Sequence, residues 1–577
     1  MESSKMKFPM GIENFEEIRM EGFYYVDKTG LIKELLTHWA KANLIIRPRR
    51  FDRTLNMSML KTFFGLDGNK EVFKETEIAK EVSLCEEYMG KFPVISISMR
   101  NINARTYEVA RDIAVATVNE VARKFQYLLD SERLTAYEQE KYTALLRPDM
   151  SEAVLYNSLK LLTILLEKHH GRKVILLLDE YDVPLEKAFE KGYYEQMATL
   201  IHNLLGQALK TNDSLEFSVL TGCMPISNKS IFTGLNNLRV FSGLDMELGR
   251  YFGFTDQEVR KLLEYYNLSQ RYESVREWYG GYQFGNTEMY CPCDVIDYCD
   301  ALRVDCDAQP QNYGVSTIGN DTVRRLIRES SKSTIQHEIE RLVAGEIIEK
   351  ELRQDLTCEE IYSSNNQIWS VLFLIGYLTQ RGRPEGRRYR LAIPNLAVRD
   401  IFTRQIRETF KESIPKNGDI VDSFCNALKN GDADEVEKRF SEYMRKTISV
   451  KNTFAEKPLK ENFYHSILLG LLRYWDIWGI FSEEESEDGY SNILVRSDDE
   501  EIGIVIGVKC VEDGRLEEAC KEALEQIESR RHEEELQEEG IRHILKYGIA
   551  CCKRRCKVLI ADAGQLESLE ETRCRIL

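Results

Sequence analysis

The feature that most restricts the fold is an alternation of apolar runs with helical segments in the first part of the chain. Three runs have the continuous apolar character of strands buried on both faces of a parallel sheet, namely FPVISISM (92–99), KVILLLDEYD (173–182) and LEFSVLTGC (215–223). Segments 106–128 and 151–170, between the first two runs, have helical apolar spacing. This alternation predicts a doubly wound α/β sheet in a region that extends to about residue 260.

The middle region, residues 261–415, has a mainly helical pattern. It ends with IWSVLFLIGYLTQRGRPEGRRYRLAIPN (368–395). Here an apolar helical stretch is followed by strand-like YLTQ, a basic turn with Gly and Pro, and strand-like YRLAIP. This order predicts a helix and a small β-hairpin, as in winged-helix modules.

The last region, residues 416–577, starts with helical segments and continues with two strand-like runs. SNILVRS (491–497) and IGIVIGVKC (502–510) are separated by the turn DDEE, which predicts a hairpin. A long charged helix and two further strand-like pieces follow, at 516–538, 547–552 and 557–562. We therefore expect a second, small α/β domain.

An acidic pair, Asp179 and Glu180, ends the run at 173–182. At the carboxyl end of a buried strand, nucleotide enzymes place one carboxylate that holds Mg²⁺ and another that orients water. In that interpretation Asp179 binds the metal and Glu180 polarises the attacking water. Acidic residues also occur at strand ends simply because they form turns. The interpretation as a nucleotide site is favoured only because a strand–loop–helix lies upstream in the chain.

That strand–loop–helix is LIIRPRRFDRTLNMSML (44–60), with an apolar run, an arginine-rich turn and a helix from about Thr54. A phosphate-binding loop needs glycine, so that backbone N–H groups can approach the phosphate, and lysine, to neutralise its charge. Within RPRRFDRT only Thr54 fits the pattern G-x-x-x-x-G-K-[ST]. The pattern alone would not identify this loop.

Nine stretches occur in a characteristic order along nearly the whole chain: PMGIENFEEIR, YVDKT, RPRRF, LLLDEYDVPL, SIFTGLNNL, YFGFTDQEV, WYGGYQFG, GYLTQRG and ENFYHSILLGLL. They resemble the bacterial and archaeal family of AAA-ATPase-like proteins that carry a C-terminal PD-(D/E)XK nuclease-like domain. The resemblance implies three parts. They are a P-loop NTPase-type parallel-sheet domain (1–260), a helical lid with a winged-helix-like region (261–415) and a restriction-endonuclease-like α/β domain (416–577).

In that family the loop reads R-P-R-R-F-G-K-[ST], and ATP and Mg²⁺ are the implied cofactors. Thr54 and Asp179 would hold the metal. The implied nucleotide-binding residues are Arg47, Pro48, Arg49, Arg50, Phe51, Asp52, Arg53 and Thr54. Asp52 and Arg53 stand at the Gly and Lys positions, and Pro225 stands where the family has an arginine suited to sensing the γ-phosphate.

These departures weaken the expected chemistry of the loop. A carboxylate at position 52 would repel a phosphate, and a planar guanidinium is not a substitute for a compact ammonium. An ion pair of Asp52 with Arg50 or Arg53 would partly neutralise both charges.

The C-terminal domain shows a similar loss. The family pattern resembles an Asp on one strand and Glu-x-Lys on the next, in which the acids hold Mg²⁺. Here Asn492 and Gly507 replace the two acids, and Lys509 remains as the candidate catalytic residue. The nearby acids Glu487, Asp488, Glu500 and Glu501 could take over the role of metal ligand. Three other residues match family positions that flank the site, namely Tyr464, His465 and Gln526.

Charge and composition limit the partners. The formal net charge of −17 repels nucleic acid, so any contact with DNA or RNA must use local basic patches. The candidate patches are residues 47–53, 381–390 and 552–557. The basic residues of each patch are also compatible with an ordinary solvated surface. The 14 cysteines lack paired C-x-x-C spacing, which favours ordinary reduced thiols. No stretch resembles a membrane helix or a signal peptide, so we expect a cytoplasmic protein.

Three functions are compatible with these features. The substitutions favour a pseudoenzyme, in which an ATPase-like and nuclease-like protein with impaired activities serves as a nucleotide- or nucleic-acid-associated scaffold. The intact Asp179–Glu180 pair favours instead an active ATP-dependent, Mg²⁺-dependent nuclease acting on DNA or RNA in defence against mobile elements. A module that binds a protein partner, or forms a homo-oligomer, is the third alternative.

Overall fold

The computed structural model describes residues 5–38, 40–224, 238–313, 333–343, 345–353, 367–382, 386–403, 418–447, 457–472, 478–482, 492–497, 502–511, 514–529, 536, 541 and 543–562. The chain divides into two compact units, residues 1–316 with 349–398 and residues 317–348 with 399–577. The expected boundaries near 260 and 415 stay predictions. In the described part of the chain, no helix is long and apolar enough to cross a membrane.

The first unit contains a five-stranded sheet with the order β2-β3-β4-β1-β5, in which every neighbouring pair is parallel. The strands are β1 Ala42–Ile46, β2 Val94–Ser98, β3 Val174–Asp179, β4 Leu215–Gly222 and β5 Leu238–Phe241. All residues of β1 and β3 are buried, as their continuous apolar sequences predict. The predicted doubly wound sheet is confirmed, and β5 is an additional strand.

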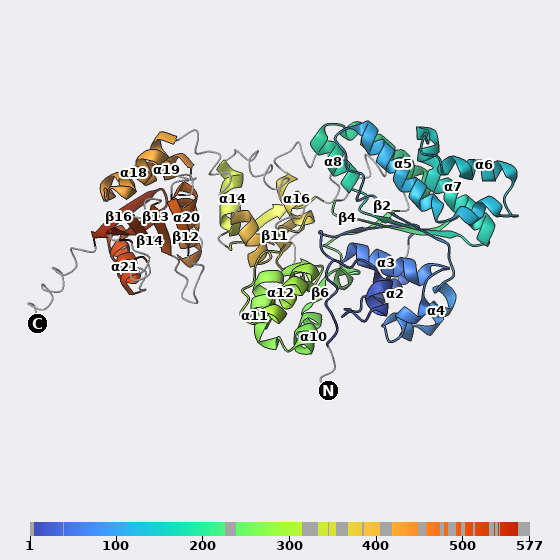
Figure 1. Ribbon diagram of the computed structural model, residues 1–577, viewed down its shortest axis with the longest axis horizontal. Helices are drawn as coiled ribbons and strands as arrows, with labels where there is room; N and C mark the ends of the chain where they lie inside the picture. The colour runs from blue at the N-terminus through green and yellow to red at the C-terminus, as the bar shows by residue number, and fades with distance from the viewer. Residues whose placement is uncertain are drawn as a thin grey trace, which may run out of the picture. The chain divides into compact units, whose positions relative to one another are not determined.

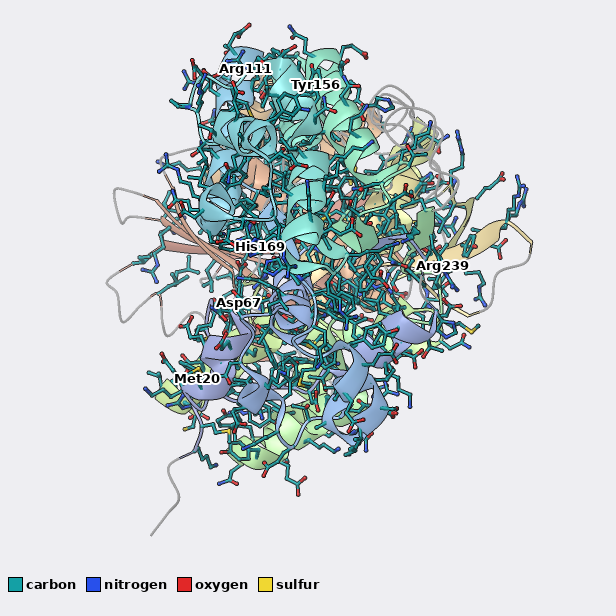
Figure 2. The ribbon with its side chains drawn as sticks, turned by 90° about the vertical axis from the view of Figure 1, so that its right-hand side faces the viewer. Met20, Asp67, Arg111, Tyr156, His169 and Arg239 are labelled. Carbon is teal, nitrogen blue, oxygen red and sulfur yellow. The ribbon has the colours of Figure 1, made fainter. Side chains whose placement is uncertain are left out.

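Helices cover both faces of this sheet (Figure 1). On one face lie α5 Tyr107–Arg123, α6 Ala136–Leu145, α7 Glu152–His170 and α8 Val183–Lys191, and α9 Tyr194–Leu209 packs against α7 and α8. On the other face lie α2 Gly30–Thr37, α3 Arg53–Phe64 and α4 Val82–Tyr88. Arg111 of α5 and Tyr156 of α7 are labelled on this helical layer in Figure 2.

Local sequence signals set the ends of these helices. Ser151 accepts a hydrogen bond from the Val154 N–H and caps α7, which ends at Gly171 in a left-handed conformation. The helix predicted at 106–128 ends earlier, at Arg123. The Lys124 and Phe125 N–H groups bond the carbonyls three residues back, and a short 3₁₀ helix, Gln126–Asp130, follows.

The rest of the first unit consists of small elements. The N-terminal helix α1 is Phe15–Met20. A three-stranded sheet, β6 Phe254–Thr255, β7 Tyr282–Phe284 and β8 Thr287–Tyr290, is accompanied by α10 Asp256–Tyr266, α11 Tyr272–Tyr279 and α12 Pro292–Val304. The predicted helix and hairpin at 368–395 are present as α16 Ile368–Leu374, β10 Thr379–Gln380 and β11 Arg388–Ala392, and β9 Ile348–Glu351 joins that sheet.

The second unit contains a five-stranded mixed sheet with the order β12-β13-β14-β15-β16. The strands are β12 Trp478–Ser482, β13 Asn492–Ser497, β14 Ile502–Cys510, β15 His543–Cys552 and β16 Arg555–Asp562. Only β14 and β15 are parallel, and β13 and β14 form the predicted antiparallel hairpin. This is the smaller α/β domain expected from the sequence.

The described helices of the second unit are α14 Ser333–Val343, α18 Gly418–Lys429, α19 Ala433–Thr447, α20 Lys457–Leu472 and α21 Leu516–Ser529. Helices α18 and α19 lie on one face of the sheet and α21 on the other (Figure 1). Alternate residues of β14 therefore enter different cores. Ile504 and Ile506 pack with α18, α19 and α20, whereas Val505 packs with Ile527 of α21.

Candidate nucleotide-binding and nuclease-like sites

The loop between β1 and α3 has two residues with positive φ angles, Arg50 at 69° and Asp52 at 53°. Asp52 immediately precedes α3, and its carbonyl oxygen accepts a hydrogen bond from the Asn56 N–H at 3.0 Å. Glycine is the usual residue in this left-handed conformation, although Asp is among the few others that tolerate it. The loop therefore has at residue 52 the backbone conformation expected of the family's glycine, with a carboxylate attached.

Arg47 is directed into the core. It is fully buried, its guanidinium lies 5.3 Å from the ring centres of both Phe252 and Phe284, and it donates to the carbonyls of Ile46 and Phe241 at 2.7 and 3.1 Å. Burial lowers the pKa of Arg47 to about 10. This buried arginine anchors the start of the loop.

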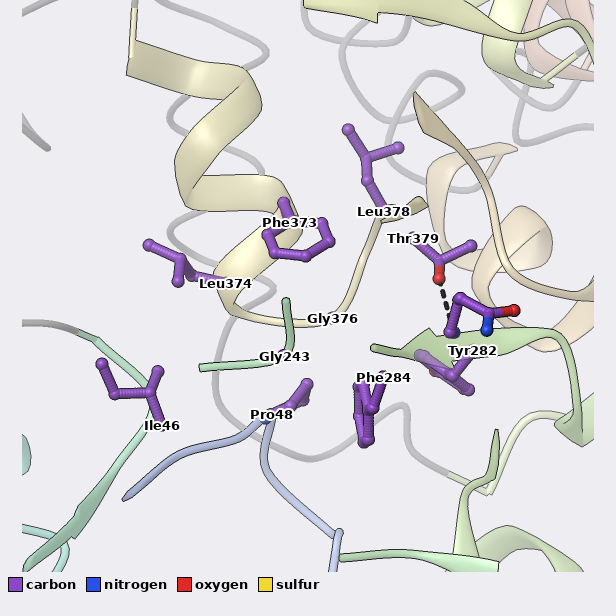
Figure 3. A pocket seen from close by; sticks show the side chains of 11 residues that line it. Ile46, Pro48, Gly243, Tyr282, Phe284, Phe373, Leu374, Gly376, Leu378 and Thr379 are labelled. Atoms are coloured by element: carbon purple, nitrogen blue, oxygen red, sulfur yellow. Dashed lines mark hydrogen bonds between the residues drawn. The ribbon is translucent and has the colours of Figure 1, made fainter. Parts of the chain in front are cut away.

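Pro48 and Phe51 are also packing residues. Phe51 lies in edge contact with Tyr282, at a centroid distance of 4.9 Å. Pro48 lines a small apolar hollow with Phe284 and Gly376, shown in Figure 3. A Cβ atom on Gly376 would lie 2.8 Å from the Pro48 Cβ, so this close approach requires glycine. These contacts fix the loop against the neighbouring small strands.

Arg49 and Arg50 are held by acids from distant parts of the chain. Arg49 pairs with Glu186 of α8 at 2.6 Å. Arg50 pairs with Asp294 and Asp297 of α12 at 2.5 and 3.2 Å. The segment 47–53 is not a solvated basic surface, because its arginines are largely buried and engaged inside the unit.

Arg50 and Arg53 pair with Asp294 and Glu180, so the suggested ion pair of either arginine with Asp52 does not form. Burial raises the pKa of Asp52 to about 7, and the nearby Lys28 only partly opposes this. The Lys28 ammonium is already bound by both carboxylate oxygens of Glu258, at 2.8 and 2.6 Å. Asp52 is therefore a poorly compensated carboxyl group at the start of α3.

Thr54 and Asp179 converge, as the sequence predicts. The Thr54 hydroxyl donates to the Asp179 Oδ2 at 2.7 Å, and the Thr221 hydroxyl donates to the Asp179 Oδ1. Burial raises the pKa of Asp179, and the two hydroxyl hydrogen bonds oppose that rise. A carboxylate beside a hydroxyl is a donor set that fits Mg²⁺, so these residues could hold the metal of a Mg²⁺-nucleotide. Thr221 was missed, although a threonine at the end of the adjacent strand-like run was a usable signal.

Glu180 lies between two arginines. Arg53, at the family's lysine position, places Nη2 3.6 Å from one Glu180 oxygen, and Arg100 places Nε 2.9 Å from the other. Arg100 also binds both carboxylate oxygens of Glu13, at 2.9 and 2.8 Å, and approaches the Thr54 hydroxyl at 3.4 Å. Sequence analysis missed Arg100, whose only signal is a basic residue directly after the strand-like run at 92–99.

Asp182 fixes the end of β4. Its Oδ2 accepts hydrogen bonds from the N–H groups of Cys223 and Met224 at 2.7 and 3.0 Å. Pro225, the third departure from the family pattern, comes next in the chain and lies outside the described residues.

In the second unit, the three predicted nuclease positions are neighbours. Asn492 of β13 lies directly opposite Gly507 of β14, and Lys509 is two residues further along β14, on the same face. Asn492 and Lys509 are buried. A Cβ atom on Gly507 would lie 3.1 Å from the Ala523 carbonyl oxygen and 3.2 Å from the Ile527 Cδ1, so α21 fills the space that a side chain would need.

The flanking residues have structural contacts. The Tyr464 hydroxyl donates to the Lys553 carbonyl at 2.9 Å, and His465 is buried. Glu461, which was not predicted, is buried and accepts the Cys510 N–H at 3.1 Å, directly after Lys509. Gln526 lies on α21, and four acids proposed as replacement ligands are outside the described residues: Glu487, Asp488, Glu500 and Glu501.

The other two basic segments are only partly exposed. Arg381 donates to the carbonyls of Gly281 and Pro394 at 2.7 and 3.2 Å, whereas Arg388 and Arg390 are exposed on β11. In the segment 552–557, Lys557 pairs with Glu437 at 2.9 Å, and Lys553 and Arg555 are exposed.

Comparisons with known proteins agree with this architecture. Residues 9–232 match the family described as "Predicted AAA-ATPase", and residues 459–560 match the PD-(D/E)XK nuclease superfamily. Over 300 residues the chain is 27% identical to a protein of Azotobacter chroococcum mcd 1 described as "Uncharacterized protein in vnfD 5'region". That match covers 51% of this chain and 52% of the relative, so the similarity spans about half of each protein.

Proposed function

We propose that this chain, which carries an AAA-ATPase-like domain followed by a PD-(D/E)XK nuclease-like domain, is a protein in which both reactive sites are impaired. In this proposal the first domain binds nucleotide weakly and hydrolyses it slowly or not at all. The second does not cleave nucleic acid. The protein then acts as a nucleotide- or nucleic-acid-associated scaffold.

The observation that carries the proposal is the position of Arg53. A lysine at this place in a phosphate loop would reach the β- and γ-phosphates. Arg53 is 5% exposed and its guanidinium is directed at Glu180, the residue expected to polarise the attacking water. Arg53 therefore forms an ion pair at 3.6 Å with Glu180, which Arg100 also binds at 2.9 Å. Asp52 adds a carboxylate where the helix N-terminus would otherwise favour phosphate.

The second site supports the same proposal. Mg²⁺ requires several oxygen ligands in a fixed arrangement. Asn492 offers a neutral amide oxygen, Gly507 offers no side chain, and α21 contacts the position where a side chain on residue 507 would begin. The residues present at positions 492 and 507 therefore do not fit a metal-dependent nuclease site.

The test for the first domain is the double variant Asp52→Gly with Arg53→Lys. It restores the family's loop chemistry, and Gly suits the left-handed backbone at this position. We expect ATP affinity, measured by calorimetry with Mg²⁺, to rise about tenfold or more. Arg239→Lys is the control, because Arg239 lies outside the loop, on β5, and pairs with Glu247. Unchanged ATP binding in the double variant would count against the proposal.

The test for the second domain is Asn492→Asp with Gly507→Glu. If only the ligands were lost, the double variant should cleave an oligonucleotide in Mg²⁺, at the cost of lower stability. Gly503→Glu is the control for crowding, because a Cβ there would lie 3.1 Å from Leu536 on the same face of β14. Cleavage by the unmodified protein that Lys509→Ala abolishes would refute the proposal for this domain.

A second candidate, an active ATP-dependent and Mg²⁺-dependent nuclease, is favoured by one contact. Thr54 still donates to Asp179, as in a site prepared for a Mg²⁺-nucleotide. ATP hydrolysis by the purified protein, lost in Asp179→Asn and unaffected in Asp213→Asn on the surface, would support this candidate over the first.

A further inference from the structure

We propose that Arg53 and Arg100 form a seat for the terminal phosphate of a polyphosphate, and that the carboxylate of Glu180 occupies this seat as an internal anion. The inference rests on the proposed function, because it takes the loop and the end of β3 as the nucleotide site. It goes further by assigning Arg100 to phosphate recognition and Glu180 to competition with the ligand.

The geometry is a single carboxylate bracketed by two guanidinium groups. Arg53 approaches one oxygen of Glu180 at 3.6 Å and Arg100 binds the other at 2.9 Å. The side chain of Glu180 is 11% exposed. Its φ angle of 54° keeps the backbone in a left-handed conformation directly after β3. The carboxylate is thus held at one place by its own backbone and by two cations.

The seat has more donor capacity than Glu180 uses. Arg53 is nine-tenths buried or more, and its Nη1 has no hydrogen-bond partner among the described residues. A buried donor without a partner is costly, so an acceptor that reached Nη1 would be bound favourably. A phosphate offers three oxygens and up to two negative charges, so it could satisfy Nη1 and still bind both arginines.

Arg100 is positioned for this role by an independent anchor. Two of its nitrogens bind the carboxylate of Glu13, ahead of α1, at 2.9 and 2.8 Å. If a phosphate displaced Glu180, this anchor would keep the guanidinium in place. Arg100 also lies 3.4 Å from the Thr54 hydroxyl, so the seat adjoins the proposed metal ligands.

Guanidinium groups recognise carboxylates and phosphates with the same paired geometry. A carboxylate attached to the same chain has a high effective concentration, and a free phosphate must compete with it. Neutralising Glu180 should therefore strengthen the binding of a polyphosphate, even though a Glu at this position would ordinarily be considered a catalytic residue.

The test uses inorganic pyrophosphate and the full-length protein in EDTA, so that neither hydrolysis nor metal binding contributes. By calorimetry we expect Glu180→Gln to bind pyrophosphate about tenfold more tightly than the unmodified protein. Glu186→Gln is the matched control, because it removes the same charge from a largely buried acid that pairs with Arg49. An equal gain in Glu186→Gln, or no gain in folded Glu180→Gln, would overturn the proposal.

Two further variants test the contribution of Arg100. Adding Arg100→Ala to Glu180→Gln should abolish the gain. Arg100→Ala alone alters a half-exposed side chain and is informative even if Glu180→Gln does not fold. It should weaken pyrophosphate binding severalfold, and an unchanged affinity would overturn the assignment of Arg100. Failure of Asp52→Gly with Arg53→Lys to gain ATP affinity would count against the proposed function while leaving this pyrophosphate result intact.

Discussion

Replacing Asp52 by Asn should stabilise the first unit, and the gain should depend on pH. Asn has nearly the shape of Asp and also tolerates the left-handed conformation that residue 52 adopts. The substitution therefore removes the charge of a carboxyl group that burial destabilises, with little change in packing. It also leaves Lys28 paired with Glu258.

The magnitude follows from the pKa of Asp52, which burial raises from 3.8 to about 7. At about 1.36 kcal/mol per pKa unit, the ionised carboxylate lowers the free energy of unfolding by at most about 4 kcal/mol. Asp52 keeps partial contact with water, which screens this cost. We therefore expect the Asn variant to gain about 1 to 2 kcal/mol at pH 8.

The sign follows from proton binding. Below about pH 4, the Asp52 carboxyl is protonated in both the folded and the unfolded chain, so ionisation costs nothing. Between about pH 4 and pH 7 the folded protein binds more protons than the unfolded chain, and stability falls as pH rises. Above about pH 7 both states are ionised and the full cost applies. The gain from Asp52→Asn should thus be small at pH 4 and constant above about pH 8.

The assay is urea unfolding of the Asn variant and the unmodified protein at pH 4.5, 6 and 8, followed by circular dichroism. Asp67→Asn serves as the control, because Asp67 is an exposed acid, labelled on the surface in Figure 2. A gain that is equal at the three pH values, or a loss of stability at pH 8, would refute the account of Asp52 as a buried, poorly compensated carboxyl group.

Three further predictions concern Asp52, Thr221 and Gly507. Polyphosphate binding to the unmodified protein should strengthen from pH 8 to pH 6, because Asp52 becomes neutral below its pKa of about 7. In the Asp52→Asn variant, titration calorimetry should show a polyphosphate affinity that depends less on pH. Thr221→Val should destabilise the first unit by about 1 to 3 kcal/mol, because Asp179 loses a buried hydrogen bond, whereas Thr199→Val on α9 should have little effect in the same unfolding assay. Gly507→Ala should lower the melting temperature of the second unit, because the added Cβ meets α21; Gly206→Ala, which has open space around it, should not lower that of the first.

Much of the fold could be predicted because its signals are local. The run VILLL predicts a strand buried on both faces, and it forms β3 with every residue buried. The hairpin of β13 and β14 could also be predicted, because two strand-like runs flank a short acidic turn. The strands β5 and β12 were missed, because Arg in LRVF and Gly in WGIFS interrupt the apolar run that identified β1 and β3.

The sequence by itself determined the order of the two matched domains and the main strands, and its resemblance to a known family supplied the candidate site residues. Only the tertiary structure decided what the charged side chains contact. Arg49 and Glu186 are 137 positions apart, and Arg50 and Asp294 are 244 apart. Strand and helix signals arise from neighbours along the chain, whereas the partner of an arginine depends on which distant segments the packing of the sheet brings to it.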